Sequence, residues 1–375
     1  MKEISINARR LRKSIGLSQS AVAAKAGISR LAYINIESGK SVPKSDTLLA
    51  ISQALEVGIF DLIRPSPTFQ SLRFRSRVVP SARQRALKEQ ELVALAEWLK
   101  NYAELESLLG DRRQYAFSES SPSNLVEAAG YVRKRLGISD DSPIGNLQAL
   151  ISDAGIKLYF LDAKIPGFSG ASVGQEDSGP CIAVNRHGMS VERQIFTVAH
   201  ELGHLLLHRS SYSVKQSYEP ISDAKQEQEA DVFASHLLIP AGAFLKRWNE
   251  ELGLHWIDRV LSLKRYFRVS YQVILFRLKE QQAARTDLHK EFAIGFQQRY
   301  HHDLKNHFEP DALADSMPLR EPEGLRNLDF CEERFSRLIR AALLKGEISI
   351  SRAAQLSRLS LDDMRNLRQS WLEEP

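Results

Sequence analysis

The stretch TVAHELGHLLLH, residues 197–208, places His200, Glu201 and His204 in an otherwise apolar run. The leucines predict a buried helix, and burying unpartnered titratable groups costs on the order of several kcal/mol in desolvation. Side chains four residues apart leave one face of a helix, so the two imidazoles can bind a single ion. The HExxH spacing therefore predicts a zinc site with His200 and His204 as ligands and Glu201 as the general base.

A second stretch, KQEQEADVFASHLLIP at residues 225–240, predicts another amphipathic helix. Glu227 and Asp231 are four residues apart, so Glu227 can be the third ligand while Asp231 holds the outer N–H of a histidine. Glu229 points about 200° away from Glu227 around the helix, so the two cannot bind the same ion. We favour Glu227 over Glu229 because only Glu227 is followed by a carboxylate one turn later.

Two further side chains are candidates for contacts with a substrate. His208 lies one more turn along the first helix, too far along its axis to join His200 and His204 at one ion. We expect it to cap the helix end or to contact substrate. A developing oxyanion needs a donor besides the metal, and the sequence offers His208 or Tyr212.

The hydrophobic period shortens before the first of these helices. Residues 156–162, 167–173 and 181–185 are short β-like runs separated by Gly, Pro and Asp turns. Residues 167–173 or 181–185 either offer an edge to an extended substrate segment or are plain sheet structure. The predicted fold is mainly α with a small β-sheet: an all-α helix-turn-helix domain, an α+β zincin-like domain and a helical C-terminal region.

The N-terminal 63 residues alternate short helical patterns with turn signals. In LSQSAVAAKAGISRLAYINIESGK, residues 17–40, Ser18 and Ser29 cap two helices and Gly27 makes the tight turn between them. The helix that follows Ser29 would lie in the major groove of DNA. A further helix is expected to turn four side chains towards the core: Leu48, Leu49, Ile51 and Leu55. The candidate DNA contacts are Gln19, Ser29, Arg30, Ile34 and Asn35.

These candidates have different expected roles. Arg30 could read guanine or hold a phosphate, and Gln19 would hold the DNA backbone. Ile34 could contact a thymine methyl group. Two basic clusters indicate either nucleic-acid binding or solvated, charged segments: Arg9, Arg10, Arg12 and Lys13, and then Arg73, Arg75, Arg77, Arg83 and Arg85.

A length of 375 residues accommodates two or three domains. Two prolines in RPSPTFQ, residues 64–70, mark a boundary. We predict a helix-turn-helix domain at 1–64, a basic linker and connecting helix at 65–120, a metal-binding domain at 121–285 and a helical region at 286–375. The last contains GEISISRAAQLSRLSLDDMRNL, residues 346–367, which is either core or a partner-binding arm.

Composition excludes several classes of protein. The two cysteines, Cys181 and Cys331, are too few for a disulfide scaffold or a cysteine-rich zinc site. The N-terminus has no apolar core typical of a secretory signal, and no stretch approaches the roughly 18 apolar residues that span a bilayer. We expect a cytoplasmic protein with no membrane partner.

The N-terminal region resembles the lambda-repressor-like (Xre) helix-turn-helix family over roughly residues 4–63. The resemblance rests on LSQSAVAAKAGIS, IESGKSVP and TLLAISQAL. Two residues depart from the family pattern. Tyr33 stands where an aliphatic core residue is usual, and Ile34 where a small or polar residue is usual.

FTVAHELGHLLLH followed by EQEADVFASHLLIP resembles the ImmA/IrrE family of zinc metallopeptidases, over roughly residues 125–280 with a weaker similarity to 370. The resemblance implies His200, His204 and Glu227 as zinc ligands and Glu201 as the base. Members typically cleave a helix-turn-helix repressor and release genes for stress responses or mobile-element transfer. Some carry an Xre domain in front.

Together these features predict a zinc endopeptidase on a DNA-binding module that regulates transcription by limited proteolysis of a repressor. One alternative is a DNA-binding regulator whose metallopeptidase fold is a sensor or dimerisation domain. Another is an antitoxin-like protein of a toxin–antitoxin or phage-defence pair. The expected partners are an operator-like DNA site, a protein substrate and a second copy of the chain, since such domains usually read two-fold sites.

Overall fold

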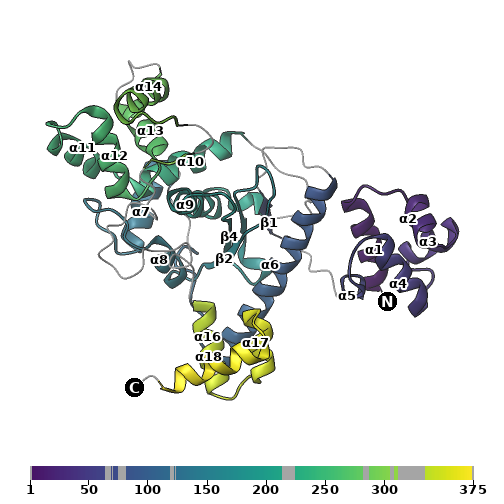
Figure 1. Ribbon diagram of the computed structural model, residues 1–375. Coiled ribbons are helices and arrows are strands. Elements are labelled where there is room, and N and C mark those ends of the chain that lie inside the picture. Colours follow the sequence, from purple (N-terminus) through teal and green to yellow (C-terminus); the bar gives the residue numbers. More distant parts are fainter. Residues whose placement is uncertain are drawn as a thin grey trace. The chain divides into compact units, whose positions relative to one another are not determined.

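The computed structural model describes residues 2–63, 69, 71–74, 82–118, 122, 124–212, 224–281, 287–304, 308–310 and 334–373. The chain divides into two compact units, one formed by 1–69, 76–98 and 163–168 and the other by 70–75, 99–162 and 169–375. The prediction of a mainly helical chain with a small sheet is confirmed (Figure 1). Among the described residues, no helix combines the length and hydrophobicity needed to cross a bilayer. The bounds of the four predicted domains remain predictions.

The first unit contains five helices of a helix-turn-helix arrangement among its described residues. They are α1 (Lys2–Ser14), α2 (Gln19–Lys25), α3 (Arg30–Glu37), α4 (Ser45–Ala54) and α5 (Ile59–Ile63). Ser18 Oγ accepts a hydrogen bond from Ala21 N, and Ser29 Oγ accepts one from Ala32 N, both at 3.1 Å. Gly27 has a φ of +65°, which a residue without Cβ adopts freely. The predicted caps and turn are therefore confirmed.

The core of this unit accommodates the unusual Tyr33. Its ring is fully buried, and its hydroxyl donates to the carbonyl of Ala8 at 3.3 Å. Ile51 and Leu55 are buried as predicted, but Leu49 is 45% exposed, so its predicted place in the core is wrong. Ile51 and Leu55 lie four residues apart on one helical stripe, and Leu49 falls outside it.

The second unit places helices around a four-stranded sheet. The helix α6 (Ala82–Leu109) begins in the first unit and ends in the second. The elements before the metal-binding helices are β1 (Leu72–Phe74), α7 (Leu125–Arg135), α8 (Leu147–Asp153), β2 (Lys157–Leu161), β3 (Gly170–Val173), η1 (Gln175–Asp177) and β4 (Cys181–Asn185). The elements that follow are α9 (Val191–Leu207), η2 (Arg209–Tyr212), α10 (Ala224–Leu238), α11 (Ala241–Glu250), α12 (Trp256–Phe267), α13 (Tyr271–Gln281), α14 (Leu288–Tyr300), α16 (Arg334–Leu344), α17 (Ile350–Ser357) and α18 (Leu361–Glu373).

The strand order is β1-β3-β4-β2. β3 pairs antiparallel with β1 and with β4, whereas β2 and β4 are parallel. β3 and β4 are therefore both interior strands of the sheet, which favours plain sheet structure, the second of the two alternatives that the sequence left open for them. The covering strand β1 lies in the segment predicted to be a basic linker, where no strand was expected.

The C-terminal helices pack on the second half of α6. Arg334 of α16 donates to Glu106 at 2.6 Å, and Arg352 of α17 donates to Asn101 at 2.9 Å. Ser349 caps α17 through the amide of Arg352. These contacts make the predicted helix-turn-helix-like pattern part of the second unit's packing, which favours core over a separate arm. Cys331 lies outside the described residues.

Candidate metal centre and DNA interface

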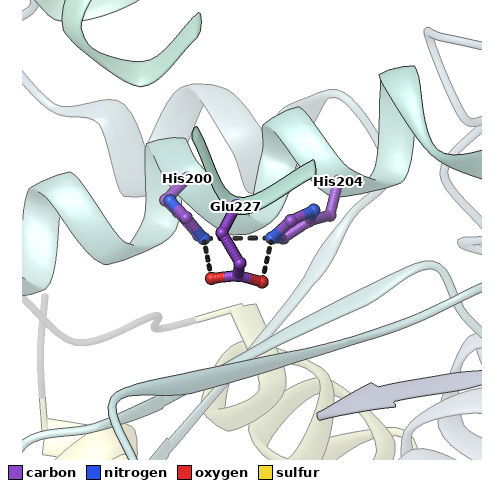
Figure 2. Close-up of side chains that lie close together, drawn as sticks. All are labelled: His200, His204 and Glu227. Atoms are coloured by element: carbon purple, nitrogen blue, oxygen red, sulfur yellow. Dashed lines mark hydrogen bonds and ion pairs between the residues drawn. The ribbon is translucent and has the colours of Figure 1, made fainter. Parts of the chain in front are cut away.

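Two helices bring three potential metal ligands together. His200 and His204 project from α9 and Glu227 from α10, and their ligand atoms all lie within 4.8 Å of one another (Figure 2). The two Nε2 atoms are 3.0 Å apart, and the carboxylate oxygens of Glu227 lie 3.6 Å from His200 Nε2 and 3.3 Å from His204 Nε2. This is the only such group of His, Cys, Asp and Glu among the described residues.

The donor set fits a zinc ion. Ligands about 2.1 Å from a tetrahedral ion lie about 3.4 Å from each other, close to the three separations observed. Burial lowers the pKa of His204 to about 3, so its imidazole is neutral and keeps a lone pair for an ion. Two histidines and one carboxylate are the protein ligands of a catalytic zinc site with an open fourth position.

Small residues between the helices set this geometry. A Cβ on Gly203 would lie 2.9 Å from Phe233 Cδ1 and 3.4 Å from Ala230 Cα. A larger side chain at Gly203 would push α10 away from α9. The glycine inside the HExxH motif therefore allows Glu227 to reach the two histidines.

Each ligand histidine has a partner on its outer nitrogen. Nδ1 of His200 lies 2.7 Å from Asp231 Oδ1, and Nδ1 of His204 lies 2.8 Å from His208 Nδ1. The far nitrogen of His208 is 2.9 Å from Glu229 Oε2. An imidazole that offers Nε2 to an ion carries its proton on Nδ1. The protons then point outward, from His200 to Asp231 and from His204 through His208 to Glu229.

His208 therefore lies behind a ligand, on the side away from the ion. It closes the end of α9, one of the two roles expected from the sequence, and its amide donates to His204 O at 3.0 Å. Both ring nitrogens are engaged with His204 and Glu229, which argues against the alternative role as oxyanion donor or substrate contact. Glu229 meets His208 and not the ligand nitrogens, in line with the preference for Glu227.

The candidate base Glu201 is held by a residue that the sequence did not reveal. Ser172 Oγ on β3 lies 2.6 Å from Glu201 Oε2 and 2.7 Å from the hydroxyl of Tyr212. A Cβ on Gly170 would be 3.0 Å from Glu201 Oε1, so glycine lets β3 pass close to α9. Burial raises the pKa of Tyr212 well above its usual value, so its hydroxyl stays protonated and can donate.

The second unexpected residue is Arg73 on β1. Its side chain is 3% exposed, its Nη2 lies 3.5 Å from Glu227 Oε1, and its Nη1 donates to Gln226 Oε1. The interpretation of Arg73 as part of a nucleic-acid footprint or a solvated linker is therefore wrong. The rest of that cluster lies outside what the structure describes, either entirely (Arg75 and Arg77) or in its side chains (Arg83 and Arg85).

Comparison with known families matches both units. The Peptidase M78 family, described as the IrrE N-terminal-like domain, matches residues 151–279, which contain α9, α10 and β2 to β4. A helix-turn-helix family matches residues 9–62. The chain is a fusion of an Xre-like helix-turn-helix domain and an IrrE/ImmA-like domain. These two matched domains support a DNA-binding regulator with a metallopeptidase-like domain.

The other comparisons add little. No curated protein matches the chain. Among solved structures, a crystal structure of a PrgX/iCF10 complex is 12% identical and covers 80% of this chain and 91% of its own, with a TM-score of 0.17. A superposition that poor carries no argument about fold or function.

The helix-turn-helix domain exposes the start of α3. Ser29 and Arg30 are exposed there, and Ile34 and Asn35 are half-buried. Leu31, which the sequence analysis passed over, is 68% exposed and is the more accessible apolar side chain on this helix. Leu31 is therefore a better candidate than Ile34 for contact with a thymine methyl group.

Part of the N-terminal basic cluster is used inside the domain. Arg12 forms a bidentate ion pair with the buried Glu37, with Nε–Oε1 at 2.5 Å and Nη2–Oε2 at 3.2 Å. Arg9 donates to the carbonyl of Glu37, and Gln19 donates to its carboxylate at 2.7 Å. Arg9, Lys13 and Arg30 remain exposed for phosphate contacts, whereas Arg12 is structural. The role of Gln19 at the DNA backbone stays a prediction.

Proposed function

We propose that the chain is a zinc-dependent endopeptidase carried on a DNA-binding domain, and that it regulates transcription by cleaving a repressor protein. The observation that supports this most directly is the convergence of His200, His204 and Glu227, with Glu201 beside them on the same helix. The donor set, the neutral imidazole of His204 and the outer hydrogen bonds suit an ion that must keep one position open.

The chemistry divides among few groups. A bound zinc ion would polarise the scissile carbonyl and lower the pKa of a water molecule. Glu201 takes the proton from the attacking water at its carboxylate and returns it to the leaving amine. Ser172 orients that carboxylate through its 2.6 Å hydrogen bond. Tyr212 is protonated and 2.7 Å from Ser172, and its hydroxyl would have to turn from Ser172 to donate to the developing oxyanion.

The DNA-binding domain gives this chemistry a place to act. Arg30, exposed at the start of α3, would contact a guanine or a phosphate in the major groove. Binding as a homodimer to a two-fold site would bring the peptidase next to a DNA-bound repressor. The activity would then be local proteolysis at a promoter.

The test is Glu201→Gln in the full-length chain, with zinc content, DNA binding and cleavage measured together. The substrates to try are the helix-turn-helix repressors encoded beside the gene. We expect cleavage to disappear while about one zinc per chain and the DNA affinity remain, because glutamine keeps the shape but cannot accept a proton. Wild-type protein without zinc would contradict the proposal.

A second function is favoured by one observation, the contact of Arg73 with Glu227. A regulator that senses metal could use such a contact to couple the ion to the segment after its DNA-binding domain. In that case Glu201→Gln would regulate its target genes as wild type does. Loss of regulation in this variant, with zinc retained, would exclude a pure sensor.

A further inference from the structure

The strand β1 lies outside the part of the chain that matches the IrrE-like family. The family match covers residues 151–279 and includes β2, β3 and β4, whereas β1 lies at residues 72–74. In the order β1-β3-β4-β2, the only neighbour of β3 besides β1 is β4. Without β1, β3 would be the free edge of the matched domain, ready to pair with another extended segment.

This edge is the one beside the candidate base. Arg73 pairs with Ser172 in the antiparallel register, and Ser172 holds the carboxylate of Glu201. Gly170, at the start of the same strand, also lies next to Glu201, since a Cβ there would be 3.0 Å from Glu201 Oε1. An extended peptide on β3 would therefore run past Glu201, and the chain's own residues now occupy that path.

The side chain of Arg73 strengthens this occupancy. It is 3% exposed and meets Glu227 and Gln226 on α10. Burying a guanidinium is unfavourable unless a partner compensates the charge, and here the partner is a candidate metal ligand. The strand thus reaches a candidate metal ligand through Arg73, and its backbone pairs with the strand whose Ser172 holds the base.

The beginning of the segment is also fitted to the domain. Ser71 is buried, and its amide and hydroxyl both donate to Asp177 Oδ2, at 2.7 and 2.8 Å. The amide of Gly174 donates to Ser71 O at 2.9 Å. A Cβ on Gly174 would lie 3.0 Å from Ser71 Cβ, so glycine permits this close approach.

We infer that residues 71–74 occupy the peptide-binding edge of the site as an internal pseudosubstrate. The ligand that this edge takes is an extended peptide whose basic side chain reaches Gln226 and Glu227. The inference rests on the proposed function, because a peptide edge matters only if the site acts on peptides. A tethered occupant competes at an effective concentration in the millimolar range, so a substrate must displace β1 before it binds.

The position of β1 in the chain gives this competition a regulatory consequence. The segment follows the helix-turn-helix domain and precedes the IrrE-like domain, so it is covalently connected to both. A change in the DNA-binding domain that pulls β1 away from β3 would free the edge of β3 for a substrate. The peptidase would be held inactive until then.

The first experiment measures docking of the strand in the full-length chain by amide hydrogen exchange. Arg73→Glu places a second carboxylate against Glu227, and Arg112→Glu makes the same charge change at an exposed site. We expect exchange at the Gly174 amide to accelerate at least about tenfold in the first variant only. The amide of Lys157, which bonds Pro180 O in the β2–β4 half, should not change.

The second experiment measures the vacated edge. A fluorescent peptide, GGSLRFGG, carries residues 71–74, and GGSLEFGG is its matched control. We expect the first peptide to bind the Arg73→Glu chain at least about tenfold more tightly than wild type, and the control peptide to bind neither. Asp177→Asn, which weakens the anchor of Ser71, should change exchange and binding in the same direction and guards against misfolding of the first variant.

Unchanged exchange at the Gly174 amide in both Arg73→Glu and Asp177→Asn would overturn the inference. Equal binding of the first peptide to these two variants and to wild type would overturn it as well. Zinc content of the same samples keeps the two proposals apart. Chains that hold zinc but fail both strand measurements would refute the internal pseudosubstrate and leave the peptidase. Chains that pass both strand measurements but hold no zinc would refute the peptidase.

Discussion

Glu37 in the helix-turn-helix domain and Glu227 in the IrrE-like domain are both largely buried carboxylates that meet an arginine. The carboxylate of Glu37 accepts short hydrogen bonds, at 2.5 Å from Arg12 and 2.7 Å from Gln19. The contacts of Glu227 with its two histidines and Arg73 lie between 3.3 and 3.6 Å. Those separations are too long for good hydrogen bonds but suit ligands around a small ion.

The difference separates a structural carboxylate from a functional one. The hydrogen bonds of Glu37 complete a network within one domain, and its charge is compensated there by Arg12. Glu227 faces the Nε2 lone pairs of two histidines and the guanidinium of Arg73, at distances that suit a shared cation. Glu37 therefore belongs to the frame of the helix-turn-helix domain and Glu227 to the candidate metal site.

The largest expected effect comes from removing the functional carboxylate. Glu227→Ala should reduce zinc affinity by more than about 100-fold, the upper end of what an outer-shell contact contributes. Zinc content by metal analysis should fall from about one per chain to a trace, while the helix-turn-helix domain keeps its melting behaviour. Full zinc content in this variant would show that Glu227 is not a ligand.

Removing the structural carboxylate should do the reverse. Glu37→Gln leaves Arg12 without a charged partner, so we expect the helix-turn-helix domain to lose about 2 kcal/mol of unfolding free energy at pH 7, with zinc content unchanged. Denaturant unfolding followed by a probe in residues 2–63 measures this. An unaffected domain would show that the pair is dispensable.

The stability effect of Glu37→Gln should depend on pH. Burial raises the pKa of Glu37, but hydrogen bonds from Arg12 and Gln19 outweigh it and hold the pKa below its usual value. A lowered folded-state pKa stabilises the domain above the unfolded pKa, and the stabilisation is lost as pH falls through the folded one. The stability difference between wild type and Glu37→Gln should therefore shrink below about pH 4.

The motifs of local sequence could be predicted because a helix repeats every 3.6 residues. His200 and His204, then Glu227 and Asp231, are pairs four apart, and that spacing alone places each pair on one face. The caps at Ser18 and Ser29 follow from side-chain chemistry at helix starts. None of these inferences needed to know which helix packs against which.

The rest depended on contacts between distant segments. Arg73 reaches Glu227 across more than 150 residues through a strand of only three residues, too short to leave a periodic signal. Ser172 contacts Glu201 only because Gly170 lets β3 approach α9. The pairing of His208 with Glu229 depends on how α9 packs on α10, a distance that Gly203 sets.

The two outer carboxylates of the site allow a finer comparison. Asp231 meets His200 directly, at 2.7 Å. Asp231→Asn keeps an acceptor but removes the charge, so we expect zinc affinity to fall about tenfold, the lower end of the effect of such partners. Competition with a chelator of known affinity measures it, and Asp162→Asn, at another carboxylate paired with a histidine, is the matched control.

Glu229 should have the smallest effect because it acts through an intermediate. Its carboxylate meets His208, and only His208 meets the ligand His204. Glu229→Gln should therefore lower zinc affinity by about threefold, less than Asp231→Asn does, because the lost charge is one imidazole further from the ion. The same chelator competition measures this change in affinity. His208→Phe removes the middle member of the series His204–His208–Glu229 and should lower zinc affinity more than Glu229→Gln does. An effect of Glu229→Gln as large as that of Glu227→Ala would contradict the indirect role assigned to Glu229.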